Sequence, residues 1–131
     1  MSENEKDQNE DRSKWTVQQW TDYARKGNTD LQGANLEGAK LSNTRKGSLR
    51  LYDANLEGAN LKSASLYKST LKDANLKGAN LAGAQLLGSN LTGADLRGAN
   101  LDGANLFKVD LRGANLEGHD LDDLRKRVTG F

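Results

Sequence analysis

Few side chains in this sequence have the types and spacing that chemistry requires, and the clearest group lies near the C-terminal end. The only histidine, His119, is followed by Asp120, Asp122 and Asp123. Imidazole and carboxylates can bind a metal ion or transfer protons when they converge in a pocket. One histidine beside surface aspartates is weak support for such a site, and Asp122 with Asp123 suits a helix start, where the dipole favours negative charge. We therefore expect no catalytic, cofactor-binding or metal-binding residues.

Spacing and composition argue against other reactive sites. Gly78 and Gly83 have the separation found in a phosphate-binding loop, but no Gly-Lys-Ser/Thr follows them, and the same spacing recurs along the chain. The sequence contains no cysteine, which excludes disulfide frameworks, thiolate zinc sites and cysteine nucleophiles. The sequence thus predicts a protein that is not an enzyme and needs no cofactor.

Charge and hydropathy narrow the choice of partner and location. The 131 residues include 19 basic and 18 acidic side chains, a formal net charge of +1. This balance argues against a nucleic-acid-binding protein, which normally has a basic excess, and also against an acidic mimic of nucleic acid. Residues 1–14 form a polar tail that we expect to be disordered, and no segment resembles a signal peptide or a membrane span. We expect a cytoplasmic protein that binds neither nucleic acid nor membrane.

A five-residue repeat determines the elements that carry these side chains. From Leu31 to Leu121, every fifth residue is leucine in 18 of 19 positions, and the exception is Lys46. Alanine lies two residues before this column in 12 repeats, asparagine or aspartate lies directly before it in 13, and glycine lies two residues after it in 11. Residues 29–123 therefore read as repeated A-N-L-x-G.

A period of five fits a chain that turns a corner in every repeat. In an α-helix the leucines would scatter around the axis, and in a straight strand they would alternate between the two faces. In a short extended segment, alanine and leucine point to the same inner side and asparagine points outward. The x-G pair then forms the corner, where glycine relieves the steric cost of a positive φ. Stacked coils would satisfy the backbone and align the leucines in inner ladders.

On these residues, the chain resembles the pentapeptide-repeat family, whose motif is A-(N/D)-L-x-x, and the match covers residues 29–123. The resemblance implies an all-β solenoid, a right-handed quadrilateral β-helix with short helical caps. It also implies four pentapeptides per coil, so that the repeats make between four and five coils. The chain is most similar in pattern to small bacterial members, often cyanobacterial ones.

The N-terminal end of such a solenoid needs a cap, because the core is otherwise exposed to water. Residues 15–28 have the features of a capping helix. Thr16 and Gln19 have the spacing of a capping box, and Trp15 with Trp20 fits a hydrophobic staple. Gly27 fits a helix stop, so we expect a helix at about residues 17–26 with Trp20 over the first coil.

The C-terminal end has a shorter signal. Asp120 and Asp123 are suited to cap a last short helix, and we assign residues 124–131 to a C-terminal cap or tail. Leu121, Leu124 and Val128 would share the inner face of this helix. His119 occupies an alanine column in the final coil, where we expect a space-filling or partly exposed residue.

One segment breaks the repeat, at Lys46 and Leu49. Because no residue is gained or lost, we expect the register of the coils to continue through it. The simpler interpretation is a bulged corner with Lys46 in solvent, and a local binding feature is the alternative.

With four pentapeptides per coil, residues four repeats apart form ladders on the outer faces. The position after leucine gives four such ladders: Gln32, Tyr52, Lys72, Thr92 and Arg112; Glu37, Glu57, Lys77, Arg97 and Glu117; Ser42, Lys62, Ala82, Asp102 and Asp122; and Gly47, Tyr67, Leu87 and Phe107. In the fourth ladder Tyr67, Leu87 and Phe107 form an exposed apolar strip flanked by Lys68 and Lys108. Contiguous apolar surface often marks an interface, although isolated exposed apolar side chains are ordinary.

The function best supported is a non-enzymatic binding or scaffolding module that contacts an unidentified protein, or a second copy, through an outer face. The family suggests an alternative, because some members regulate or protect type II topoisomerases by imitating DNA, but those resemble acidic dimeric rods. An enzyme is the third possibility, and a deep cleft that gathers His119 with carboxylates would support it.

Overall fold

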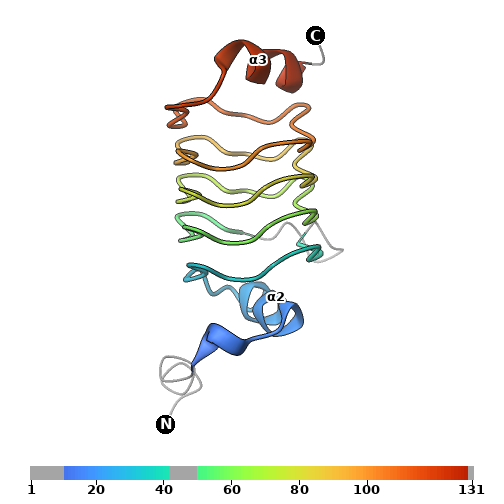
Figure 1. The fold of residues 1–131 in the computed structure, drawn as a ribbon, viewed down its shortest axis with the longest axis vertical. Coiled ribbons are helices and arrows are strands. Elements are labelled where there is room, and N and C mark those ends of the chain that lie inside the picture. Colours follow the sequence, from blue (N-terminus) through green and yellow to red (C-terminus); the bar gives the residue numbers. More distant parts are fainter. Residues whose placement is uncertain (1–10, 42–49, 130–131) are drawn as a thin grey trace.

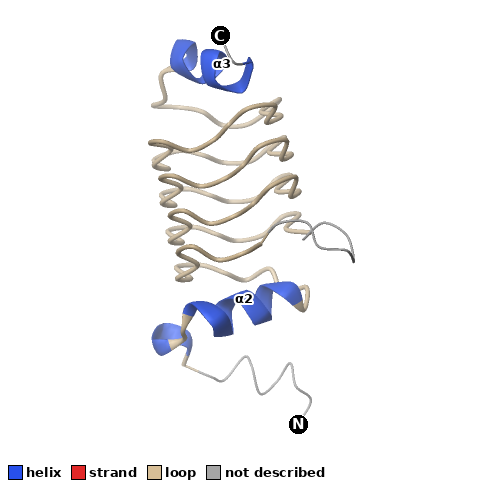
Figure 2. Ribbon diagram, turned by 90° about the vertical axis from the view of Figure 1, so that its right-hand side faces the viewer, coloured by secondary structure: helices blue, strands red, loops and turns tan. Residues whose placement is uncertain are grey.

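The computed structural model describes residues 11–41 and 50–129, which form a stack of coils with a helix at each end (Figure 1). The short 3-10 helix η1 (Arg12–Lys14) and the helix α2 (Val17–Arg25) lie at the N-terminal end of the stack, and α3 (Leu121–Thr129) covers the C-terminal end. In the view of Figure 2, α2 lies across the first coil. No helix in the described part of the chain is both long and apolar enough to cross a bilayer.

Each five-residue side ends in a tight turn, which explains the x-G pair of the repeat. In the first side, the Ala34 N–H donates to the Leu31 carbonyl at 3.0 Å, and φ of Gly33 is +68°. A positive φ at the third residue of a hydrogen-bonded four-residue turn is characteristic of type II, which favours glycine there. The predicted corner is therefore confirmed.

Every backbone N–H group of one repeat donates a hydrogen bond, and three of the five donate to a neighbouring coil. In residues 75–79, two N–H groups donate to the following coil, one to the preceding coil, one across the turn and one to the Asn75 side chain, at 2.8–3.0 Å. The Asn75 amide oxygen accepts from the Lys77 N–H, a contact that recurs in most repeats that have asparagine or aspartate before leucine. Asparagine thus satisfies the one donor that neither the turn nor the neighbouring coils reach.

Residues four repeats apart face each other in most of the stack, so a coil consists of four sides of one pentapeptide each. Parallel bridges join Asn55 to Asn75 and Asn75 to Asp95. We number the sides by their central leucines: side 1 contains Leu51, Leu71, Leu91 and Leu111; side 2 contains Leu31, Leu56, Leu76, Leu96 and Leu116; side 3 contains Leu36, Leu61, Leu81 and Leu101; side 4 contains Leu41, Leu66, Leu86 and Leu106.

The first coil is longer than the others, and the predicted register through the break is wrong. Asp30 pairs with Asn55, which lies five pentapeptides later, whereas Asn55 pairs with Asn75, which lies four pentapeptides later. The additional pentapeptide falls between Lys40 and Arg50, whose partners Ser65 and Thr70 are only one side apart. The chain therefore takes in one extra repeat, and the described leucines on both sides of it keep their inward places. Lys46 and its predicted bulge lie outside the described residues.

This longer coil changes two of the predicted ladders. The Gly33 N–H donates to the Glu57 carbonyl at 2.9 Å, so Gln32 stacks on Glu57 instead of Tyr52. Likewise, the Gly38 N–H donates to the Lys62 carbonyl at 2.8 Å, which places Glu37 below Lys62. After Arg50 the ladders follow the predicted spacing of four pentapeptides, except that Asp122 belongs to α3.

The core is a column of leucines with alanines at its corners, as the repeat predicts. Twelve leucines between Leu31 and Leu91 are essentially inaccessible to solvent, and the alanine column is buried beside them. Burial of one leucine contributes about 2 kcal/mol before the entropy of ordering is subtracted.

Between coils, single residues pair at the centre of each side, so the described residues form no continuous strand. The predicted β-helix walls are instead ladders of isolated parallel bridges.

The N-terminal cap forms as predicted. Thr16 accepts from the Gln19 N–H at 3.2 Å, and the Gln19 side chain accepts from the Thr16 N–H at 2.8 Å, which makes the capping box. Trp15 and Trp20 meet edge to face at 4.9 Å between ring centroids, and Trp20 is buried against the core. Gly27, with φ of +96°, ends the helix.

Regular structure is present before the predicted boundary at residue 15. Residues 1–10 lie outside the described residues, but residues 12–14 form η1, which Asp11 caps by accepting from the Ser13 N–H. The Arg12 guanidinium lies 4.5 Å from the centroid of the Tyr23 ring, and this packing holds η1 against α2.

At the C-terminal end, α3 starts three residues before the predicted cap. Asp120 accepts from the Asp123 N–H at 3.1 Å, so Asp120 is the capping residue. Leu124 is buried and Val128 packs partly against the core, but Leu121 is 55% exposed, which corrects its predicted inward place. Leu121 lies at the first turn, where the helix has just left the last coil.

Candidate protein-interaction surface

Tyr67, Leu87 and Phe107 stack on consecutive coils of side 4, as the sequence predicts. The Lys68 N–H donates to the Leu87 carbonyl at 3.0 Å, and the Gly88 N–H donates to the Phe107 carbonyl at 2.9 Å. Tyr67 is 40% exposed and Phe107 is 38% exposed, while Leu87 between them is half-buried. We call these three residues the apolar strip. Gly47, placed in the same ladder by the sequence, lies outside the described residues.

The two lysines beside the apolar strip occupy corner positions that favour glycine. The φ angles of Lys68 and Lys108 are +54° and +61°, in the left-handed region. The Lys68 ammonium lies 5.2 Å from the Tyr67 ring centroid, and the Lys108 ammonium lies 5.4 Å from that of Phe107. Both distances are within the range of cation–π attraction.

Side 4 differs from the other three sides in charge. Its described residues include no carboxylate, and its charged side chains are Lys40, Lys68 and Lys108, all of them exposed. Carboxylates occur on each of the other three sides: Asp53, Asp73 and Asp110 on side 1; Asp30, Glu57, Asp95 and Glu117 on side 2; Glu37 and Asp102 on side 3. Within the described chain, no lysine forms an ion pair. The nearly neutral protein thus has one wall that is apolar and cationic.

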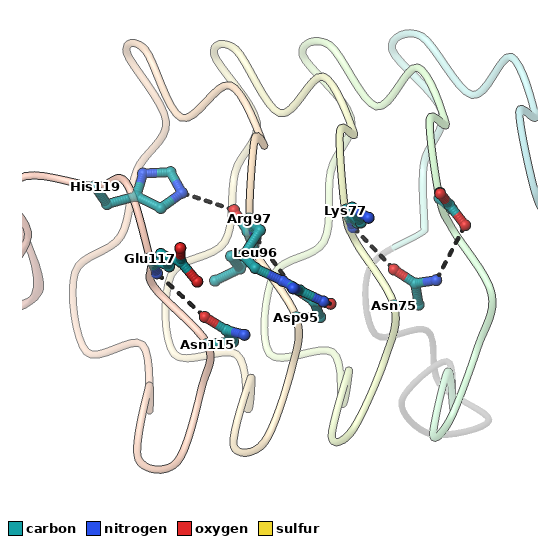
Figure 3. Close-up of polar contacts among 9 residues, drawn as sticks. Asn75, Lys77, Asp95, Leu96, Arg97, Asn115, Glu117 and His119 are labelled. Atoms are coloured by element: carbon teal, nitrogen blue, oxygen red, sulfur yellow. Dashed lines mark hydrogen bonds and ion pairs between the residues drawn. The ribbon is translucent and has the colours of Figure 1, made fainter.

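Side 2 is a polar ladder with charges of both signs (Figure 3). Arg97 donates through Nη2 to Asp95 Oδ2 at 2.6 Å and through Nε to Oδ1 at 2.9 Å. These hydrogen bonds lower the pKa of Asp95 to about 2. Asn75 and Asn115 in the same ladder accept from the backbone N–H groups of Lys77 and Glu117. Side 2 therefore carries charges of both signs, and its Asp95–Arg97 pair is satisfied within the ladder.

The candidate chemical group at the C-terminal end does not converge. The half-buried His119 meets the Leu96 carbonyl through Nε2 at 2.7 Å, and because a carbonyl only accepts, Nε2 carries the proton (Figure 3). Asp120 caps α3, and Asp123 pairs with Arg127 at 3.3 Å. Among the residues that the structure describes, no three acidic or histidine side chains are placed to hold a metal ion.

Sequence reasoning missed two features of the caps. Arg127 donates through Nη2 to the carbonyls of Ala104 at 2.9 Å and of Leu101 at 2.6 Å, the second of which also accepts from the Ala104 N–H across the turn. A cavity of about 490 Å³ lies beside the N-terminal cap, lined by Arg12, Trp15 and neighbouring residues of η1, α2 and the first coil. Neither Arg127 nor Arg12 belongs to a recognisable local motif, so only the fold reveals their contacts.

The chain was compared with protein-family models and with proteins of known sequence or structure. The family model described as pentapeptide repeats matches this chain in eight copies, at residues 27–45, 50–86, 69–106 and 89–123. No curated protein sequence matches the chain significantly.

Solved structures show the same architecture. HetL, a pentapeptide repeat protein involved in heterocyst differentiation regulation from the cyanobacterium Nostoc, is 35% identical over 67% of this chain and 36% of its own, with a TM-score of 0.52. A pentapeptide repeat protein of the Arabidopsis thaliana thylakoid lumen is 31% identical over 70% of this chain and 63% of its own, with a TM-score of 0.56. The chain therefore spans less than two thirds of either protein.

QnrB1, a plasmid-mediated fluoroquinolone resistance protein, is 23% identical over 76% of this chain and 55% of its own, with a TM-score of 0.46. A likeness of this strength carries no argument about function. The repeat model covers most of the chain, the coils consist of five-residue sides with inward leucines, and the similar solved structures have the same repeat. The chain belongs to the pentapeptide-repeat family.

Proposed function

We propose that the protein is a non-enzymatic binding or scaffolding module that contacts another protein through side 4. The observation that carries this proposal is the apolar strip, whose two aromatic rings are more than one third exposed on the one described side without carboxylates. Aromatic residues are enriched at the centres of protein interfaces. Membership of the family also leads us to expect the right-handed, four-sided coil predicted from the sequence.

Two observations support a binding role over catalysis. The His119 and Asp120 side chains are occupied in capping contacts, which leaves no converging acid–base group among the described residues. HetL takes part in the regulation of differentiation, a role that fits a protein acting through contacts. Imitation of DNA is less well supported, because it requires a continuous negative face, and every described side includes at least one basic residue.

The experiment uses a photoreactive phenylalanine analogue in the full chain, in cells. When the analogue replaces Leu87, we expect a discrete cross-linked protein band that mass spectrometry can identify. The matched control is Ala82, which has the same repeat position in the same coil but lies on side 3 and is also half-buried. Cross-links of equal yield from both positions, or none from Leu87, would contradict the use of side 4.

Self-association is distinguished by light scattering after size exclusion. If the occupant is a second copy, wild type will run at twice the mass of the Tyr67→Ser, Leu87→Ser, Phe107→Ser variant. Equal masses, together with Leu87-specific cross-links, would identify a different protein as the partner.

A further inference from the structure

We propose that side 4 receives an acidic amphipathic helix, packed along the apolar strip with its carboxylates beside Lys68 and Lys108. This inference rests on the proposed use of side 4 and adds the chemistry of the partner segment. Three independent observations carry it: the charge of the side, the spacing of the strip and the backbone conformation of the two lysines.

The charge of side 4 selects the sign of the partner. Lys68 and Lys108 lie over aromatic rings of their own wall and form no ion pair with described residues. Each ammonium can therefore bind a partner's carboxylate without breaking an ion pair within the described chain. Lys40 adds a third positive charge on the same side. A basic segment would meet like charges with no described carboxylate on this wall to offset them, which disfavours it.

The spacing of the strip selects the conformation of the partner. Adjacent coils are about 4.8 Å apart, so Tyr67, Leu87 and Phe107 span about 9.6 Å in two equal steps. Apolar residues of a helix at i, i+3 and i+7 rise by about 4.5 Å and about 10.5 Å, close to those steps. Alternate residues of an extended segment rise by about 6.8 Å and fall out of step after the first contact. The strip therefore matches one stripe of a helix that runs parallel to the solenoid axis.

The backbone at the two lysines points to a role that is not structural. Of the five described non-glycine residues with positive φ, three are Asp53, Ser63 and Asp73, and the other two are the lysines that flank the strip. Lysine is not a residue type that favours this region, and glycine would occupy it without strain. Residues held in such strained conformations cluster at active sites, ligand clamps and switch regions, which fits a binding surface at the strip.

The test is a selection from a displayed library of randomised helical peptides of about 18 residues, long enough to span the strip, against the full wild-type chain. We expect the enriched sequences to be net acidic, with apolar residues at i, i+3 or i+4, and i+7. Enrichment of basic peptides, enrichment of alternating strand-like patterns or no enrichment would each overturn the proposal.

The enriched peptides are then measured against a Lys68→Gly, Lys108→Gly variant by fluorescence anisotropy. We expect about tenfold weaker binding, because two exposed charge pairs are lost. This variant replaces strained lysines with glycine, so loss of binding cannot be attributed to unfolding. The matched control, Lys62→Ala with Lys77→Ala, removes the same charge from sides 3 and 2 and should bind as wild type. Equal binding by both variants would overturn the assigned role of the two lysines.

The same peptides distinguish failure of this inference from failure of the proposed function. If enriched peptides are not acidic helices but lose binding to the Tyr67→Ser, Leu87→Ser, Phe107→Ser variant, side 4 remains the surface and the partner chemistry is wrong. If no substitution on side 4 affects binding, both proposals fail. A wild-type dimer that this triple variant abolishes would make a second copy the occupant and would also overturn the acidic helix.

Discussion

Asp95 shows how one side chain can serve both the coil and a neighbouring charge. Its Oδ1 accepts from the Arg97 N–H at 3.1 Å, the same contact that asparagine makes in other repeats. The carboxylate differs from asparagine because it also binds the Arg97 guanidinium through two nitrogen atoms. Hydrogen bonding to the charged form lowers the pKa of Asp95 to about 2. The residue thus links the stability of the wall to pH.

The sign of this link follows from the lowered pKa. The pKa of this carboxyl is about 2 in the folded protein, below its ordinary value of 3.8. The ionised carboxylate therefore stabilises the fold at pH values above 3.8. The contribution is lost as the pH falls from about 4 towards 2. We expect Arg97→Gln to raise the pKa of Asp95 towards 3.8, as measured by NMR titration of its carboxyl carbon. Lys77→Gln is the control, because Lys77 is the smallest contributor to the shift. Unchanged titration in Arg97→Gln would contradict the assigned cause.

At the scale of the element, each five-residue side needs a positive φ at its corner, and the end of the stack needs hydrogen-bond donors from its cap. Glycine fills the second corner position in most repeats, and its φ there lies near +70° in the described coils. The last coil lacks a following coil, so some of its carbonyls need other donors. From α3, Arg127 donates to the carbonyls of Leu101 and Ala104, and within the same helix it pairs with Asp123.

Replacement of a strained corner residue should stabilise the element. We expect Lys68→Gly to raise the free energy of unfolding by about 0.5–1 kcal/mol, because the relief of left-handed strain exceeds the added freedom of the unfolded chain. Lys72→Gly is the matched control, because Lys72 lies at the first corner position and is not among the residues with positive φ. This variant should lower the free energy of unfolding by about 0.5–1 kcal/mol. Urea denaturation measures both, and a less stable Lys68→Gly would contradict the strain argument.

Loss of the C-terminal donor should weaken the last coil. We expect Arg127→Met, which keeps the apolar stem, to destabilise the protein by about 1–3 kcal/mol, because the Ala104 carbonyl loses its side-chain donor and the Leu101 carbonyl loses one of two donors. Hydrogen exchange should show the greatest loss of protection in residues 99–118. Arg125→Met is the control, since Arg125 is exposed and makes only a 3.9 Å ion pair with Asp122. Equal effects of the two substitutions would refute a capping role.

For the whole molecule, the decisive property is the number of five-residue sides in each coil. A solenoid is stable through contacts between adjacent coils, so a coil must close in register with both neighbours. Coils of four pentapeptides do so after Arg50, and the first coil does so with five. The additional pentapeptide is therefore accommodated without shifting any pairing above it.

Two deletions of equal length test this register. Removal of residues 44–48 returns the first coil to four pentapeptides and should leave the melting temperature within a few degrees of wild type. Removal of residues 74–78 leaves a coil of only three sides, which cannot align with its neighbours. We expect it to lower the melting temperature markedly or to prevent folding. Circular dichroism measures both, and similar melting of the two deletions would contradict the coil assignment.

Within the regular coils, sequence alone determined the direction in which the repeat side chains point. A leucine at every fifth position can share one interior only if the chain turns a corner in every repeat, and the turn and capping chemistry of Gly33, Thr16 and Gln19 is local. The apolar strip was also predictable, because its three residues lie in the regular coils above the break.

Only the tertiary structure decided how the repeats align. Each pentapeptide is locally equivalent to the next, so an extra one between Lys40 and Arg50 leaves the leucine period unchanged. Its presence is visible only in which carbonyl each N–H finds, as at Gly33 and Glu57. The exposure of Leu121 and the carbonyl contacts of Arg127 depend likewise on how α3 docks on the last coil. Direction is a short-range property of the backbone, whereas register is a contact between residues that lie four or five pentapeptides apart.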